Sequence, residues 1–152
     1  MTQTTEEVLN QNDNARVTRR TLPDGSRVIV KQAISAHAIR SMGHEVAMLK
    51  RVAHVDGVSK IADLPPEPNT LILKDDGDVS LAQFLESQKL DTAQAVGFVQ
   101  ALARILAGVH KAGVLHKDIC PGNLLVQANT LQPHLIDFNL AIDLNVQPAA
   151  TE

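Results

Sequence analysis

The stretch that decides the fold is VLHKDICPGNLLV, residues Val114–Val126. Apolar residues begin and end it, and His-Lys-Asp stands in its middle at residues 116–118. Pro121 and Gly122 then interrupt any regular element, because proline lacks a backbone donor and glycine weakens helices and strands alike. Asn123 follows this break. A simple connector does not need so many ionisable and hydrogen-bonding groups, so we interpret the stretch as part of a functional site.

The composition is that of an ordinary globular protein. The chain has 152 residues, 44% of them hydrophobic, and a formal net charge of −3. This length suffices for one domain with a core, or for two small lobes. The mild acidity argues against nucleic-acid and membrane partners, and no apolar run looks long enough to span a bilayer. Cys120 is the only cysteine and the N-terminus is unlike a secretory signal, so we expect a cytoplasmic protein.

The first third of the chain predicts a β-hairpin. Residues 1–13 are polar, and we expect a flexible N-terminus there. The segments 15–22 and 26–32 flank a Pro-Asp-Gly turn at 23–25, as two paired strands do.

Lys31 closes a Val-Ile-Val run in the second of these strands. Because side chains alternate along a strand, it shares a face with Ile29. Such a lysine either extends past the strand end into water or faces a cleft, and both interpretations stay open at this point.

Apolar residues recur at steps of three and four between Ser35 and Val55, which predicts a helix with one buried face. Glu45 lies at the edge of that face. A buried carboxylate is costly unless it is paired. Taken alone, Glu45 is best interpreted as bending out to solvent, and a paired, buried Glu45 is the alternative.

The remaining elements complete an α+β order. Residues 70–74 (TLILK) predict a strand. Ser80 and Gln83 form a capping box for a short helix, and Asp91 caps a longer one. Two short strands within residues 123–138 then predict a second hairpin.

Four features now follow one another along the chain. Lys31 ends a strand, Glu45 lies on the next helix, His-Lys-Asp ends at Asp118 with Asn123 five residues later, and Asp-Phe begins at Asp137. In these features the chain resembles the protein kinase superfamily, which has a strand lysine, a helix glutamate, an H-R-D-L-x-x-x-N loop and a D-F-G turn. Each feature alone is weak, since aspartate and asparagine also form ordinary turns. Their common order and spacing carry the resemblance.

The resemblance covers residues 14–142 and implies a protein kinase-like fold. An N-lobe with an antiparallel sheet and one helix would span 14–76. The start of a helical C-lobe would span 77–142, and 143–152 would be a tail. More narrowly, the chain is similar to Ser/Thr kinase-like modules that begin large bacterial signalling proteins, in which H-K-D often replaces H-R-D.

The same resemblance implies ATP and Mg²⁺ as cofactors and assigns roles to residues. Lys31 would contact the α- and β-phosphates and be held by Glu45. Asp118 would orient the acceptor hydroxyl or accept its proton. Asn123 and Asp137 would hold Mg²⁺ through oxygen atoms, which this hard cation prefers.

The nucleotide base would lie against Leu73, with the backbone of Lys74 to Asp76 reading its edge. The chain also departs from the family pattern. An Asn-rich turn stands in place of a glycine-rich loop, Cys120 replaces a lysine of Ser/Thr kinases, and Asn139 replaces the glycine of D-F-G. The chain ends soon afterwards, before any activation segment, so we expect a piece of a longer protein.

These observations predict an ATP-dependent phosphotransferase of the Ser/Thr protein kinase type, acting on a protein hydroxyl. The expected partners are a protein substrate or further domains of a larger signalling protein. A pseudokinase-like module that binds nucleotide or a partner without catalysis is one alternative. A small-molecule kinase of the aminoglycoside or RIO-like kind is another.

Overall fold

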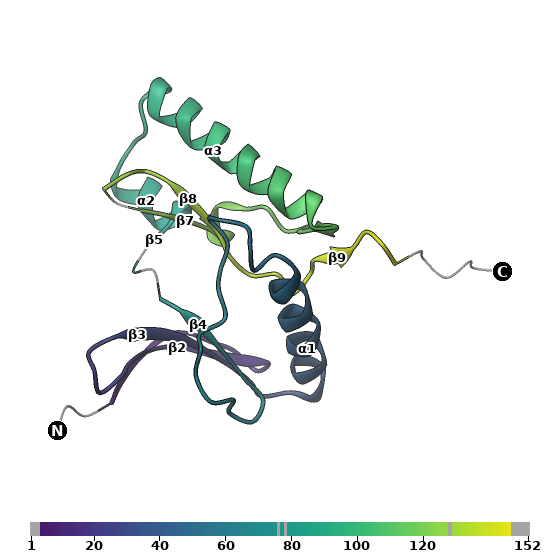
Figure 1. Ribbon diagram of the computed structural model, residues 1–152. Helices are drawn as coiled ribbons and strands as arrows, with labels where there is room; N and C mark the ends of the chain where they lie inside the picture. The colour runs from purple at the N-terminus through teal and green to yellow at the C-terminus, as the bar shows by residue number, and fades with distance from the viewer. Residues whose placement is uncertain (1–3, 76, 78, 128, 147–152) are drawn as a thin grey trace.

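Four antiparallel strands form one layer of the molecule, in the order β1-β2-β3-β4. The computed structural model describes residues 4–75, 77, 79–127 and 129–146. The strands are β1 (Thr5–Gln11), β2 (Ala15–Thr21), β3 (Arg27–Ala33) and β4 (Thr70–Lys74). Helix α1 (Ala36–Arg51) lies beside β3 and β4, as Figure 1 shows.

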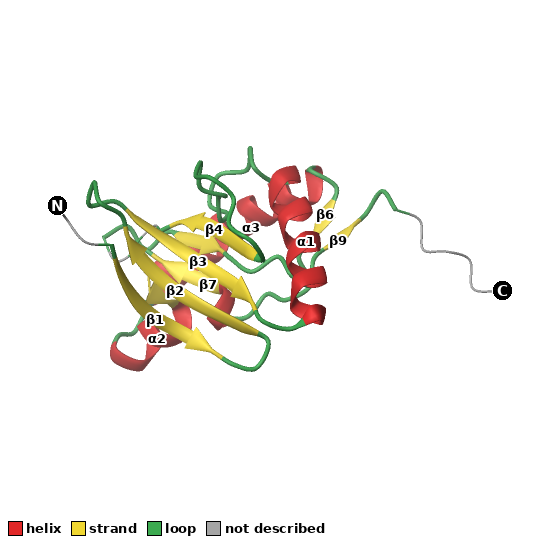
Figure 2. Cartoon of the chain, turned by 90° about the horizontal axis from the view of Figure 1, so that it is seen from below, coloured by secondary structure: helices red, strands yellow, loops and turns green. Residues whose placement is uncertain are grey.

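The second part of the molecule combines two helices with short strands. The helices are α2 (Leu81–Ser87) and α3 (Thr92–Lys111). One small sheet has the order β5-β7-β8, with strands Val79–Ser80, Leu124–Val126 and Pro133–Leu135. A second sheet pairs β6 (Val114–Leu115) with β9 (Ile142–Asp143), and a 3₁₀ turn spans Pro121–Asn123. In Figure 2 the four-stranded sheet lies at one end of the molecule and α1 with β6 and β9 at the other.

One hydrophobic core joins the two parts. It contains Leu49 of α1, Leu73 of β4, Phe84 of α2 and Val109 of α3, together with Phe138. The sheet and the helical part are therefore packed on each other through buried side chains. This packing fixes the position of one part relative to the other. The predicted α+β fold, with an antiparallel sheet, one helix and the start of a helical part, is confirmed.

The local signals at the helix ends are also confirmed. Ser80 and Gln83 form the reciprocal capping box of α2. Asp91 accepts from the Gln94 N–H, and the Gln94 side chain accepts from the Asp91 N–H in return. Helix α3 ends before Gly113, whose φ of +76° is the left-handed geometry that favours glycine.

The expectation of a flexible segment over residues 1–13 is wrong for residues 5–11. These residues form β1, which pairs with β2 from Thr5 to Gln11 with a register shift between Val8 and Asn10. Glu6 and Glu7 stand opposite Arg20 and Arg19, so complementary charges accompany the backbone pairing. The strand is exposed and lacks an apolar face, so its periodicity gave no signal.

Helix α1 is shorter than predicted. It ends at Arg51, because Val52 leaves helical geometry and is buried together with Val55, which turns the chain into the core. Ile39 is one of the apolar residues of the predicted helix, yet it is 40% exposed. Glu45 is buried instead, so its interpretation as a solvent-facing edge residue is wrong.

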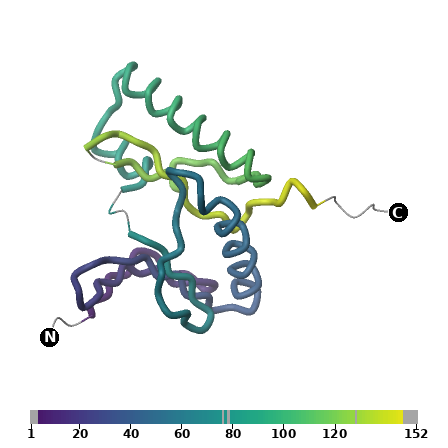
Figure 3. The backbone as a smooth tube through the Cα atoms, in the orientation of Figure 1, coloured from purple at the N-terminus to yellow at the C-terminus, as the bar shows by residue number. Residues whose placement is uncertain are grey.

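The predicted tail, 143–152, begins too early. Asp143 belongs to β9, and the Leu144 N–H donates to the Gly113 carbonyl at 2.8 Å. Residues 147–152 lie outside the described part of the chain. In Figure 3 the start of β1, at the purple end of the described trace, and β9, at its yellow end, lie on opposite sides of the molecule.

Helix α3 is long and apolar enough to cross a membrane, contrary to the expectation from sequence. Its 20 residues include an 18-residue window with a mean hydropathy of 1.3. Length and composition are weak evidence for a span, because core helices of domains meet the same criteria. Phe98, Ile105 and Val109 of α3 are buried in the core described above, but only 17% of the window is buried, and Val96 and Val99 are more than half exposed.

Candidate active site

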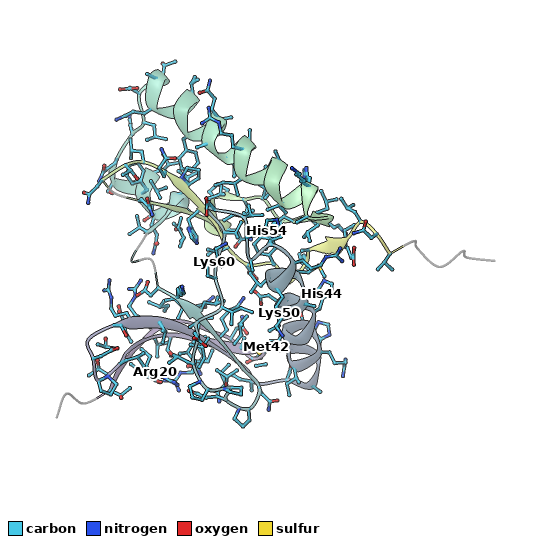
Figure 4. All side chains as sticks on the ribbon, in the orientation of Figure 1. Arg20, Met42, His44, Lys50, His54 and Lys60 are labelled. Atoms are coloured by element: carbon cyan, nitrogen blue, oxygen red, sulfur yellow. The ribbon has the colours of Figure 1, made fainter. Side chains whose placement is uncertain are left out.

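A cleft of about 670 Å³ lies between the four-stranded sheet and the turn that precedes β7. From the sheet it is lined by Ile29, Lys31 and Leu73, and from the opposite side by Asn123 and Asp137. Residues from the first third and the last fifth of the chain therefore meet in one place. A larger hollow of about 860 Å³ lies between α3 and residues 54–57, near His54 in Figure 4. It contains none of the predicted site residues, so volume alone does not locate the site.

Lys31 and Glu45 form the predicted contact. The Lys31 Nζ lies 2.8 Å from both carboxylate oxygens of Glu45. β3 points Lys31 to the Ile29 side, while α1 presents the carboxylate of Glu45, which is only 3% exposed. Each group is costly to bury alone, and the pair compensates both charges.

Asp137 completes this charge cluster. Its Oδ1 lies 3.2 Å from the Lys31 Nζ. Burial lowers the pKa of Lys31, but the carboxylates of Glu45 and Asp137 outweigh this effect and raise it above its ordinary 10.5. Lys31 is therefore a cation at neutral pH. Asp137 has a φ of +65°, a strained backbone for a non-glycine residue and a feature that gathers at functional sites.

Asp118 and Asn123 are joined directly. The Asn123 Nδ2 donates to the Asp118 Oδ2 at 2.8 Å and to the Asp118 carbonyl at 3.1 Å. Lys117, immediately before, also has a left-handed φ of +68°. The Pro-Gly break seen in the sequence forms the 3₁₀ turn that brings Asn123 back to Asp118. Asn123 also lines the cleft, and both of these hydrogen bonds use its amide nitrogen rather than its amide oxygen.

His116 is hydrogen-bonded to the backbone of the loop that carries Asp118. The Asp118 N–H donates to the His116 Nδ1 at 3.2 Å, so in the neutral ring the hydrogen is on Nε2, which donates to the Ile136 carbonyl at 3.0 Å. The ring also packs edge-on against Phe138 at 4.7 Å. Burial lowers the pKa of His116, opposed by the Ile136 hydrogen bond and the nearby carboxylates of Asp137 and Asp118. The residue therefore connects the loop of Asp118 to the segment of Asp137.

The donor set suits magnesium. Asn123 and Asp137 both line the cleft and offer an amide and a carboxylate oxygen, ligands that this hard cation prefers. Two protein oxygens with phosphates and waters would complete six-fold coordination, which is the usual way proteins bind Mg²⁺. Among the described residues, no cluster of three or more His, Cys, Asp or Glu forms a metal cage. The residues therefore fit a metal that arrives with a phosphate ligand.

Of the residues predicted to contact the base, Leu73 and Lys74 line the cleft. Asp76 lies outside the described residues. Several cleft residues were missed, and Val17 and Arg19 of β2 are among them. Val17 could have been found, because the family pattern G-x-G-x-x-G-x-V places a valine seven residues after its first glycine, and Val17 stands seven after Asn10.

Comparison with known proteins decides the family. The model of the protein kinase domain matches residues 6–152. This chain belongs to the protein kinase domain family. The match covers almost the whole chain, so the kinase-like arrangement of Lys31, Glu45, Asp118, Asn123 and Asp137 occurs in a kinase domain by sequence as well as by geometry.

Individual kinases show the same relationship. The chain is 28% identical to mitogen-activated protein kinase spk1 of Schizosaccharomyces pombe over 134 residues, which are 82% of this chain and 36% of that protein. It is 32% identical to mitogen-activated protein kinase mpkC of Aspergillus terreus over 120 residues, 75% of this chain and 32% of that protein. It is 31% identical to mitogen-activated protein kinase 4 of Rattus norvegicus over 130 residues, 76% of this chain and 47% of that protein.

The chain thus spans about a third to a half of the length of these curated relatives. All three are fungal or mammalian kinases, and the narrower resemblance to bacterial modules stays a prediction. So do the roles of the individual site residues.

Proposed function

We propose that this kinase domain transfers the γ-phosphate of ATP to a serine or threonine hydroxyl of a protein, with Mg²⁺ as the metal. The observation that supports this most is the Lys31–Glu45–Asp137 cluster in the same cleft as Asn123, which is bonded to Asp118. The acceptor would be a separate protein or a further domain of a larger one. A cytoplasmic location, where ATP is abundant, is the setting that this activity implies.

In the proposed reaction Lys31 binds phosphate oxygens. Its raised pKa keeps it charged, and Glu45 fixes its Nζ, so no reorganisation of this charge is needed when the nucleotide binds. The Lys31 Nζ lies 2.8 Å from Glu45 and 3.2 Å from Asp137. A bound phosphate would share Lys31 with Asp137, the more distant of the two carboxylates. Phosphoryl transfer is mainly positioning and charge neutralisation, which is what this cluster supplies.

Asp118 is the proposed proton acceptor. Asn123 occupies its Oδ2, and Oδ1 has no hydrogen bond within the part of the chain that the structure describes. The acceptor oxygen bonds to the γ-phosphorus, the bond to the β–γ bridging oxygen breaks with its electron pair going to ADP, and the hydroxyl proton passes to Asp118.

Asn123 and Asp137 are the residues that would hold Mg²⁺, which neutralises phosphate charge when it is bound. Cys120 supplies no positive charge where Ser/Thr kinases have a lysine, so we expect slow transfer rather than none. Lys117 is the nearest cation in the sequence to compensate, as a point charge without the fork of an arginine.

The test is transfer of the γ-phosphate from labelled ATP to a generic protein substrate, with wild type and Asp118→Asn. We expect measurable transfer by the wild type and a loss of at least about a hundredfold in Asp118→Asn, the usual contribution of a positioned acid–base group. Both proteins should bind MgATP equally well in a thermal-shift assay. Binding without transfer, unchanged by the substitution, would contradict catalysis and support the pseudokinase-like alternative.

A further inference from the structure

Asp75 is a buried carboxylate that the proposed chemistry does not use. It follows β4 directly, where the chain passes from the sheet to the helical part, and its side chain is only 3% exposed. It accepts hydrogen bonds from the Arg19 Nε at 2.7 Å, the Arg19 Nη2 at 3.4 Å and the Gly77 N–H at 2.8 Å. The Arg27 Nε lies 3.5 Å away. One carboxylate thus connects two strands of the sheet with the connection between the two parts of the molecule.

Arg19 is the central donor of this cluster. It stands two residues after Val17 on β2, and therefore on the same face, and both line the cleft. Its Nη1 also lies 3.6 Å from the carboxylate of Glu7 on β1. The hydrogen bond to Asp75 raises the pKa of Arg19, and Glu7 adds to this effect against the cost of burial. The Arg19 guanidinium therefore contacts carboxylates on both sides, Glu7 on β1 and Asp75 after β4.

We infer that the Arg19–Asp75 pair is a latch that positions the nucleotide at the end of the cleft away from Asp118. The inference rests on the proposed function and adds a positioning pair to it. Arg19 joins β2 directly to Asp75, and Arg27 joins β3 to the same carboxylate. Strand β2, which carries Val17, is therefore held to Asp75 by the hydrogen bond from Arg19. Asp75 follows Lys74, whose backbone is predicted to contact the nucleotide base.

The conformation of Gly77 supports this interpretation. Its φ of +71° is left-handed, and its N–H is held by the same carboxylate that binds Arg19. Asp75 therefore fixes both the bend at Gly77 and the position of β2. If β2 and the segment after β4 are already fixed, nucleotide binding has a smaller entropic cost of ordering them. The Arg19–Asp75 pair should therefore increase the affinity for the nucleotide.

The chain provides a matched control one residue away. Arg20 is also on β2 and binds Glu6 at 2.8 Å and Glu67 at 2.5 Å. Its side chain is 19% exposed, close to the 23% of Arg19. By strand alternation it points to the opposite face, and Figure 4 shows it on the side of the sheet turned away from α2 and α3. Arg20→Gln removes two ion pairs of the same strand without touching the cleft, although Glu6 and Glu67 are 38% and 41% exposed against 3% for Asp75.

The experiment measures the dissociation constant of MgATP by calorimetry for wild type, Arg19→Gln, Asp75→Asn, their double variant and Arg20→Gln. Circular dichroism melts show which variants are folded. We expect Arg19→Gln and Asp75→Asn each to weaken binding about tenfold, as loss of a partly buried charge pair does. The double variant should be no weaker than either single one, since both remove the same interaction. Arg20→Gln should bind like the wild type even if its melting temperature falls.

Arg19→Lys, which keeps the charge but not the fork, extends the series if Arg19→Gln does not fold. It should bind MgATP less tightly than the wild type. Affinity losses that match Arg20→Gln, or that simply add in the double variant, would overturn the latch while leaving the proposed function intact. A folded wild type that does not bind MgATP would overturn both.

Discussion

At the scale of single residues, Glu45 shows what one sequence can and cannot reveal. On its helix alone it looks like an edge residue turned to solvent, and Lys31 alone looks like a strand end. Their partnership across fourteen positions is invisible to periodicity, yet the structure buries Glu45 and bonds both of its oxygens to Lys31. The pair became predictable only when the family pattern supplied the long-range contact.

Substitution of Lys31 tests this pair. Lys31→Met leaves the Glu45 carboxylate buried next to Asp137 without a cation, so we expect a loss of about 3–5 kcal/mol in the free energy of unfolding. Glu45→Gln should cost less, because Lys31 keeps its contact with Asp137. The double variant Lys31→Met/Glu45→Gln should be more stable than Lys31→Met. Urea unfolding measures all three, and a double variant no better than Lys31→Met would contradict the assignment.

His116 gives stability a pH dependence of known sign. Burial lowers its pKa below the ordinary 6.5, so the unfolded chain takes up a proton at this ring more readily than the folded one. The contribution of the neutral His116 ring to the free energy of unfolding is present above pH 6.5. It is lost as the pH falls from 6.5 towards the pKa of His116 in the folded protein.

Urea unfolding at about pH 7.5 and about pH 5.5 measures this dependence. The wild type should lose up to about 1.4 kcal/mol more than His116→Gln between these two conditions. The variant serves as control for the other five histidines, which it retains. An equal loss in both proteins would show that His116 titrates alike in the folded and unfolded chain.

At the scale of elements, features that depend on neighbours in the sequence were predicted correctly, whereas β1 and the end of α1, which depend on tertiary contacts, were not. The hairpins and the caps at Ser80 and Asp91 depend on neighbours in sequence, and all of them are present. Strand β1 escaped prediction because it is exposed and is held by pairing with β2. The end of α1 escaped because the burial of Val52 and Val55 is a tertiary effect.

The packing of α3 on the loop after α1 depends on a close approach at Gly57. Its φ is +78°, and an added Cβ would lie 2.6 Å from the Ile105 Cδ1. We expect Gly57→Ala to destabilise the protein by about 1–3 kcal/mol, through strain and overpacking. Gly43→Ala is the control, because a Cβ there, within α1, meets nothing within 4 Å. It should stabilise the fold by up to about 1 kcal/mol, as alanine does in a helix interior.

Thermal and urea unfolding of the two variants compare these effects directly. If Gly57→Ala were as stable as the wild type, the contact between α3 and the loop after α1 would be looser than described.

At the scale of the whole molecule, the site depends on both parts of the domain. The sheet and α1 supply Lys31 and Glu45, and the segments around β6, β7 and β8 supply Asp118, Asn123 and Asp137. The common core between the parts is what brings these residues to one cleft. The order of the motifs in the sequence predicted this convergence, whereas the latch at Asp75 could not be read from any pattern, since Arg19 and Asp75 are 56 residues apart.

The most direct test of the convergence is the binding of ATP with and without Mg²⁺, measured by calorimetry on wild type and Asp137→Asn. We expect the wild type to bind ATP and Mg²⁺ to tighten this binding. Asp137→Asn should keep much of the metal-free binding and lose most of the tightening, because one of the two proposed metal ligands has lost its charge. A folded wild-type protein that ignores millimolar ATP, with or without Mg²⁺, would contradict this expectation.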